Sequence, residues 1–157
     1  MKNSLLFICT IALMVITGCS EKNPYKTPES SIFPNGRKID NDNFHGIAWL
    51  KMLAESDSLN PMYAGNVRFE SGSRTNWHSH PAGQLLIVIE GEGYYQEKGQ
   101  AKRILRKGDA VKCPPDTPHW HGATPKNEFE HIAISSSQNG STQWLHPVSK
   151  DEYNAGE

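Results

Sequence analysis

Five of the seven histidines in this chain fall into one repeated pattern. Two form the pair His78-Ser-His80, two form the pair His119-Trp-His121, and His131 follows ten residues later. Alternate residues of a β-strand point to the same face, so each pair can direct both imidazoles into one cavity. Imidazole nitrogens bind divalent transition metals. The pattern therefore predicts a metal site between two facing strands.

The elements that must position these histidines are short strands. From Asn66 onward, residues of the turn-forming types Gly, Pro, Asn, Asp and Ser interrupt the chain at short intervals. The segments between these turns are 67–70, 85–89, 94–97, 101–105, 110–113, 119–122 and 131–135. Short strands at this spacing favour a sandwich or barrel over βαβ units. The predicted fold class is therefore all-β, with one domain.

Two segments are less regular. Residues 44–54 fit neither the helical nor the strand period, and we interpret them as an outer strand. The residues after Trp144 are polar, and we expect them to fray. The predicted organisation is a leader over 1–18, a flexible tether over 19–43 rich in Pro, Ser, Asn and Lys, a domain over 44–147 and a polar tail over 148–157.

The leader is similar to a bacterial lipoprotein signal. Lys2 precedes the apolar residues 5–16, which have the length of a signal-peptide core and are too few for a membrane span. The core ends in Ile-Thr-Gly-Cys19, which resembles a lipobox, and Ser20 resembles an outer-membrane sorting signal. We therefore expect a protein of the cell envelope, lipidated at Cys19, that contacts the membrane through this lipid only. An uncleaved anchor and a buried hydrophobic helix are the alternatives.

Charge and cysteine content indicate which partners and which disulfides to expect. The 16 Lys and Arg residues nearly balance the 17 Asp and Glu residues and form no basic cluster, which argues against nucleic acid as a partner. Cys9 lies in the leader and Cys19 carries the lipid, so Cys113 is left alone and no internal disulfide is expected. We interpret Cys113 as a small buried apolar residue that contacts no histidine.

Two blocks of the chain resemble the paired motifs of the cupin family. The first contains Gly72, then His78-Ser-His80, Gln84 and Gly91, and the second contains Gly108, Pro114 and His119. The resemblance covers residues 64–136. It implies a double-stranded β-helix, or jelly-roll barrel, that holds a metal in its mouth, and it implies that a homodimer is plausible.

The resemblance also implies a ligand set. The residues that match the ligand positions are His78, His80, Gln84 and His119. Most metal cupins have a glutamate where this chain has Gln84, so here all four ligands are neutral and a divalent ion would keep its full charge. The resemblance favours manganese, with Fe, Ni, Co or Zn as alternatives. A relic of the site that binds no metal is the competing interpretation.

A narrower resemblance comes from the residues beside the ligands. The strings Arg74-Thr-Asn-Trp-His-Ser-His80 and His119-Trp-His-Gly-Ala-Thr-Pro125 are similar to small bacterial manganese cupins associated with carboxymuconolactone decarboxylase, a group that includes the cupin-type hydroxynitrile lyases. This resemblance implies that Thr75 and His131 face the substrate. Val67 and Ser135 would then line the pocket.

Each of these roles has an alternative. A cation nearby disfavours the protonated form of His131, which makes this residue a candidate base, but it can equally be a hydrogen-bonded histidine inside the barrel. His121 either lines the site or packs beside it. Thr75 either orients a substrate hydroxyl or caps a turn. Trp77 and Trp120, which alternate with the ligands, are expected in the core or a subunit interface.

Three functional hypotheses follow. The leading one is an enzyme that uses a divalent metal, Mn or Fe, to act on a small oxygenated organic molecule in a lyase or isomerase manner, with His131 moving a proton. The second uses the same ligands to activate O₂ for C–C cleavage. The third is a module that binds a small molecule without turnover.

Overall fold

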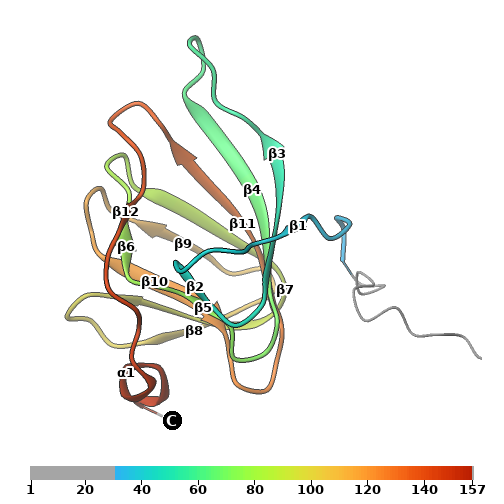
Figure 1. Ribbon diagram of the computed structural model, residues 1–157, viewed down its shortest axis with the longest axis vertical. Coiled ribbons are helices and arrows are strands. Elements are labelled where there is room, and N and C mark those ends of the chain that lie inside the picture. The colour runs from blue at the N-terminus through green and yellow to red at the C-terminus, as the bar shows by residue number, and fades with distance from the viewer. Residues whose placement is uncertain (1–30, 157) are drawn as a thin grey trace, which may run out of the picture.

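The computed structural model describes residues 31–156, and strands dominate this range (Figure 1). They are β1 (Arg37–Lys38), β2 (Phe44–His45), β3 (Ala48–Ala54), β4 (Met62–Phe69), β5 (Arg74–Thr75), β6 (His78–Ser79), β7 (Gln84–Glu97), β8 (Arg103–Arg106), β9 (Ala110–Cys113), β10 (His119–Ala123), β11 (Phe129–Ser136) and β12 (Gln143–Trp144). One helix, α1 (Lys150–Asn154), follows in this part of the chain. None of the helical structure described is long or apolar enough to cross a bilayer. The predicted all-β class is confirmed.

Strand β7 joins the two faces of the barrel. The hydrogen-bonded order is β1-β3-β4-β11-β7-β10-β5-β2, and every pairing is antiparallel. The first half of β7 pairs with β11 and β9, and its second half pairs with β10 and β8. Figure 1 shows the strands of the two faces curving towards each other to form the barrel. This is the jelly-roll half-barrel that the family resemblance implied.

The length of β7 corrects one prediction. The sequence predicts two strands, 85–89 and 94–97, with a turn between them, yet β7 runs through both. Gly91 has a φ of 78°, and the register against β11 shifts between Glu130 and His131. The glycine therefore bends the strand at a bulge and does not reverse it. A Cβ at Gly91 would collide with the carbonyl oxygen of Glu128, so no larger residue fits there.

Two apolar clusters hold the domain together. The larger fills the barrel, and its buried members are Ala48, Val67, Phe69, Leu86, Val88, Tyr95, Leu105, Val111, Cys113, Ala123 and Phe129. The smaller joins Trp77, Tyr94 and Trp120 to Val148 and Tyr153 of the C-terminal segment. The prediction that Trp77 and Trp120 pack away from the histidines is confirmed.

The C-terminal residues are ordered, which corrects the expectation that they fray. Ser149 caps α1, its side chain accepting from the Glu152 amide while the Glu152 carboxylate accepts from the Ser149 amide. Tyr153 is 6% exposed, donates its hydroxyl to the Ala123 carbonyl at 2.7 Å and lies beneath the Arg74 guanidinium at 4.4 Å. Burial of this ring explains the order, because it removes a large apolar surface from water.

The N-terminal boundary also differs from the prediction. Packing against the domain begins before residue 44, since β1 pairs with β3 and the Ile39 amide donates to the Ala48 carbonyl at 2.9 Å. Residues 44–54 form β2 and β3, which agrees with their interpretation as strand. The predicted leader and the predicted lipidation site, Cys19, lie outside the described residues.

Candidate metal centre

Three of the predicted ligands meet inside the barrel. His78 on β6 lies directly opposite His119 on β10 in the antiparallel ladder, and His80 follows His78 by two residues. One ring nitrogen from each of these histidines lies within 4.8 Å of the other two, and all three side chains are buried. The cluster is large enough for a metal ion and has the nitrogen donors that divalent transition metals accept.

Backbone carbonyls fix the orientation of two of these rings. Nδ1 of His78 lies 3.0 Å from the Asn76 carbonyl, and Nδ1 of His119 lies 2.9 Å from the Thr117 carbonyl. A carbonyl oxygen only accepts, so each Nδ1 carries the proton and donates it. Each Nε2 is then left with a free lone pair. This is the tautomer that binds a metal through Nε2.

The third ring, that of His80, has a different kind of partner. Its Nδ1 lies 3.2 Å from Oγ1 of Thr142, and its Nε2 is buried without a hydrogen-bond partner among the described residues. An unsatisfied nitrogen in this environment is unfavourable. A cation bound at Nε2 would satisfy it, which supports the fit of this cluster to a metal.

Gln84 completes the set that the sequence indicated. It begins β7, and its Oε1 lies 3.1 Å from Nε2 of His119. His119 therefore has an acceptor at each nitrogen, while a neutral imidazole has only one N–H. A cation between Nε2 and Oε1 would accept a lone pair from both atoms and remove this conflict. The geometry thus fits Gln84 as a fourth ligand beside the three histidines.

The electrostatics of the cluster favour neutral rings. Burial lowers the pKa of His80 to about 4, with the neighbouring His119 adding to the effect. Burial likewise holds the pKa of His78 well below its usual value and lowers that of His119. Neutral imidazoles keep their lone pairs at neutral pH, so the site is ready for a cation without first losing protons.

Cys113 lies closer to this centre than the sequence indicated. Its Sγ is 3.1 Å from Nδ1 of His119, so the prediction that it contacts no histidine is wrong. Cys113 lies directly opposite Gln84 in the ladder between β9 and β7, on the same inward face, and this pairing explains the contact. Burial raises the pKa of the Cys113 thiol to about 11, which keeps it protonated at neutral pH.

His121 and His131 form a buried pair next to the cluster. Nδ1 of His121 lies 3.2 Å from Nε2 of His131, and the two rings meet edge to face with centroids 4.7 Å apart. His121 lines the cavity above the cluster, whereas His131 lies behind it and is fully buried. Burial lowers the pKa of His131 to about 3, so both rings are kept neutral.

Thr75 ties two strands together next to this pair. Its hydroxyl lies 3.2 Å from both the carbonyl oxygen and the amide nitrogen of His121, donating to the first and accepting from the second. The side chain therefore bridges β5 and β10 and caps no turn. Thr75 also lines the cavity. Its oxygen accepts one hydrogen bond from His121 and has a second lone pair that can accept another.

The cavity over the cluster has a volume of about 160 Å³ and mostly apolar walls. Val67 lines it, and so do several residues that the motifs did not reveal, among them Phe44, Thr142 and Trp144. These three come from segments on either side of the motif region, and nothing in their spacing linked them to the histidines. Only the pairing of β2 with β5 and of β12 with β6 brings them there.

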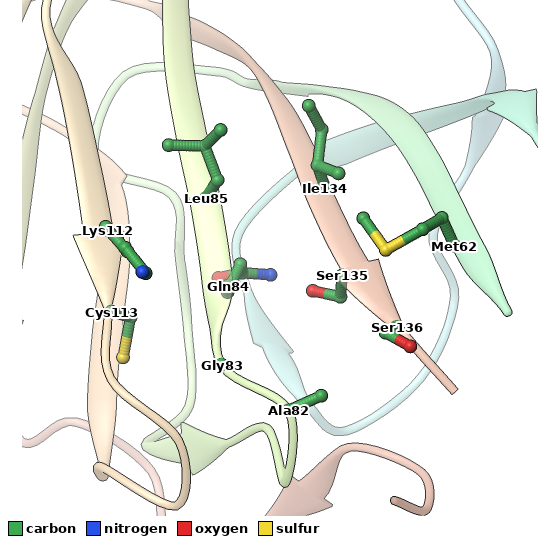
Figure 2. A pocket seen from close by; sticks show the side chains of 10 residues that line it. All are labelled: Met62, Ala82, Gly83, Gln84, Leu85, Lys112, Cys113, Ile134, Ser135 and Ser136. Atoms are coloured by element: carbon green, nitrogen blue, oxygen red, sulfur yellow. The ribbon is translucent and has the colours of Figure 1, made fainter. Parts of the chain in front are cut away.

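Ser135 lies at a second cavity, of about 330 Å³, on the other side of Gln84. Figure 2 shows the Gln84 side chain between Cys113 and Ser135, with its amide nitrogen towards Ser135. Ser135 does not line the cavity over the histidines, although its position directly opposite Gln84 on β11 keeps it within the same row of side chains. The prediction placed it on the pocket wall, and the structure places it behind Gln84.

Known proteins resemble this chain in both sequence and fold. The family model for the cupin domain matches residues 65–135. An (R)-mandelonitrile lyase from Granulicella tundricola is 36% identical over 113 residues, which cover 71% of this chain and 86% of that protein. A crystal structure of a cupin-like protein from Thermotoga maritima is 45% identical, with a TM-score of 0.78, over 81% of this chain and 99% of that one.

Two further similarities are more distant. An acireductone dioxygenase from Alcanivorax borkumensis is 29% identical over 66 residues, which cover 40% of this chain and 36% of that protein. A DMSP lyase from Ruegeria pomeroyi shares the fold at a TM-score of 0.55, with 22% identity over 69% of this chain and 55% of that structure. The matched family region includes all four candidate ligands and the His121–His131 pair.

Proposed function

Since this chain belongs to the cupin family, we propose that it is a metal-dependent lyase that cleaves a small oxygenated organic molecule. The observation that carries the proposal is the placement of a neutral histidine pair, His121 and His131, directly beside the three candidate metal ligands, with His121 lining the cavity over them. The similarity to an (R)-mandelonitrile lyase supports cyanohydrins as the substrate class to test first.

The proposed division of labour follows from the donor set. A divalent ion, with manganese favoured, would be held by His78, His80, His119 and Gln84 and would supply Lewis-acid stabilisation of negative charge on a substrate oxygen. Because all four ligands are neutral, that charge stabilisation would not be weakened by a carboxylate in the cage. The apolar walls of the cavity would exclude water from the reacting bond.

The histidine pair would move the proton. His121 faces the cavity, and donation from its Nδ1 to Nε2 of His131 leaves its Nε2 lone pair available to a substrate hydroxyl. The pKa values of both rings are depressed, so each is an unprotonated base at neutral pH. His131 thus acts through His121, and this refines the expectation that His131 meets the substrate itself.

The proposal is tested by incubating the manganese-loaded and the chelator-treated protein with mandelonitrile and aliphatic cyanohydrins, without air, and measuring released cyanide and aldehyde. We expect cleavage only in the loaded protein, with His121→Ala and His131→Ala each lowering kcat about 100-fold or more. The exposed His146→Ala is the matched control and should retain full activity. Absence of cleavage by the loaded protein, or unchanged kcat in His121→Ala, contradicts the proposal.

The second candidate function is O₂-dependent C–C cleavage. The similarity to an acireductone dioxygenase over part of the chain favours it, because the same ligands could serve that chemistry. Oxygen uptake that accompanies substrate loss, together with no reaction in the absence of air, would favour this function over the lyase. Tight binding of a small molecule that yields no product and is unaffected by His131→Ala would instead indicate a binding module.

For the location, we propose an exported lipoprotein of the cell envelope, on the periplasmic side or surface of the outer membrane. The support is the sequence of the leader, which ends at Cys19. Labelling with a fatty acid in a bacterial host should modify the full chain and not Cys19→Ala. Equal labelling of both would contradict lipidation at this cysteine. A homodimer is proposed from the family resemblance, and sedimentation measures it.

A further inference from the structure

We propose that Thr142, which lies outside the matched cupin region, is a positioning residue for the metal centre and acts through His80. The inference rests on the proposed metal site, and not on the proposed lyase activity. Its basis is the 3.2 Å contact between Oγ1 of Thr142 and Nδ1 of His80, two residues that are 62 positions apart in the chain. The family model ends at residue 135.

The three candidate histidine ligands differ in what orients them. His78 and His119 each use a backbone carbonyl two residues earlier in the chain, at Asn76 and Thr117. These partners are local, and no side-chain substitution removes them. His80 relies on a side-chain hydroxyl from a distant segment. Among the described residues, His80 is therefore the one ligand of the three whose Nδ1 has a side-chain partner and no backbone carbonyl.

The segment that carries Thr142 is held firmly against the ligand strand. Strand β12 pairs with β6, with Trp144 opposite His78 and Gln143 opposite Ser79, and Figure 1 shows the two strands side by side. The Leu145 amide donates to the Trp77 carbonyl at 2.8 Å, which continues the pairing. The position of Thr142 is thus set by the ladder between β12 and β6, which begins at the next residue, Gln143, and contains the candidate ligand His78.

A second set of contacts anchors the same segment from its far end. The Tyr153 hydroxyl donates to the Ala123 carbonyl on β10, and the Arg74 guanidinium donates to the Val148 carbonyl at 3.2 Å. The Trp144 ring lies over His78 with centroids 4.9 Å apart, so the segment also covers the cluster. Thr142 therefore begins a segment that is anchored to the barrel at several points after it.

The chemistry of the contact defines what Thr142 does. When Nε2 of His80 binds a cation, its Nδ1 must carry the proton, and the Thr142 hydroxyl oxygen accepts it. That hydrogen bond holds the ring plane and increases the basicity of Nε2. Loss of such a partner lowers metal affinity by about 10- to 100-fold. Without it, His80 would also be free to adopt the other tautomer.

The test measures metal binding to the full-length protein by competition with a chromogenic chelator, using Co²⁺ and Mn²⁺. We expect Thr142→Val, which removes the hydroxyl and keeps the shape, to raise Kd about 10- to 100-fold. Thr142→Ser restores the hydroxyl and should bind within a few-fold of wild type. Ser141→Ala is the matched control, because it removes an exposed hydroxyl next to Thr142 in the same segment and should leave Kd unchanged.

A second measurement separates positioning from loss of structure. Nitrogen NMR of the zinc-loaded protein should show a hydrogen-bonded Nδ1–H on His80 in wild type and Thr142→Ser, and a weaker one in Thr142→Val, at an unchanged backbone spectrum. The proposal is overturned if Thr142→Val binds both metals as tightly as wild type, if Thr142→Ser fails to restore binding, or if wild type binds neither metal. Intact metal binding with no cyanohydrin cleavage contradicts only the lyase.

Discussion

Gln84 determines the charge of the candidate centre. Its amide lies at the position where a carboxylate would make the cage negative, and its Oε1 is 3.1 Å from Nε2 of His119. Neutral donors bind a divalent ion less tightly than a set with a carboxylate, but they leave its charge for a substrate oxygen. A metal held at this centre would therefore be bound less tightly but would stabilise negative charge on a substrate oxygen more strongly. The identity of residue 84 sets the relation between these two properties.

Substitutions at Gln84 test this balance. Gln84→Ala removes an oxygen donor, so the metal content of the purified protein should fall at least about 10-fold, and His119→Ala should abolish binding. Gln84→Glu should bind the metal more tightly than wild type, because the added negative charge attracts the cation. Elemental analysis after gel filtration gives the content. The exposed Gln100→Ala is the control, and unchanged occupancy in Gln84→Ala would exclude Gln84 as a ligand.

The C-terminal helix matters beyond its own five residues. Helix α1 is too short to be stable alone, and it is ordered because Tyr153 packs into the smaller apolar cluster beside Trp120 and beneath Arg74. The strand before it, β12, forms a wall of the metal cavity. The helix therefore acts as an anchor for an element of the site, although it contributes no residue to the cavity.

Removal of this anchor should be measurable in two ways. Tyr153→Phe loses the hydrogen bond to the Ala123 carbonyl and should lower the free energy of unfolding by about 1 kcal/mol. Tyr153→Ala also loses the ring and should lower it by about 3 kcal/mol. Urea unfolding followed by tryptophan fluorescence gives both values. A Tyr153→Ala variant as stable as wild type would show that α1 does not hold the segment in place.

The whole barrel encloses five histidines that share one electrostatic environment. The pKa values of His78, His80, His119, His121 and His131 all lie below the ordinary value, and burial is the largest cause for each. In the unfolded chain each histidine would have a pKa of about 6.5. At a pH between the folded and unfolded pKa values, these histidines are protonated in the unfolded chain and neutral in the folded protein. Acid therefore favours unfolding of the molecule as a unit.

This difference fixes the sign of the pH dependence. The free energy of unfolding of the chelator-treated protein should be highest above about pH 7 and should fall as the pH drops, with a slope approaching about 1.4 kcal/mol per pH unit for each such histidine. The fall continues to about pH 4 for His80 and about pH 3 for His131. Urea midpoints between pH 7.5 and 5 measure it. His131→Gln should have a shallower profile, and a flat wild-type profile would contradict the burial of neutral rings.

The sequence by itself determined the ligand pattern and the class of fold. The two His-x-His pairs and the glycine and proline spacing around them are local features, and the strand period of two converts such spacing directly into a shared face. The strand period predicted that each pair shares a face, and the resemblance to the cupin motifs implied that His78, His80 and His119 converge. The turn-rich intervals likewise predicted short strands, and failed at Gly91, where a bulge and a turn have the same local composition.

The tertiary structure alone decided what surrounds the ligands. The placement of His131 behind His121, the contact of Cys113 with His119 and the contact between Thr142 and His80 each join segments that are far apart in the chain or separated by a register that spacing does not reveal. Such contacts depend on which strands pair and where the ladder begins, and a shift of one residue would turn each side chain to the other face. For this reason the candidate metal ligands could be predicted from the sequence, while the residues that orient them and shape the cavity could not.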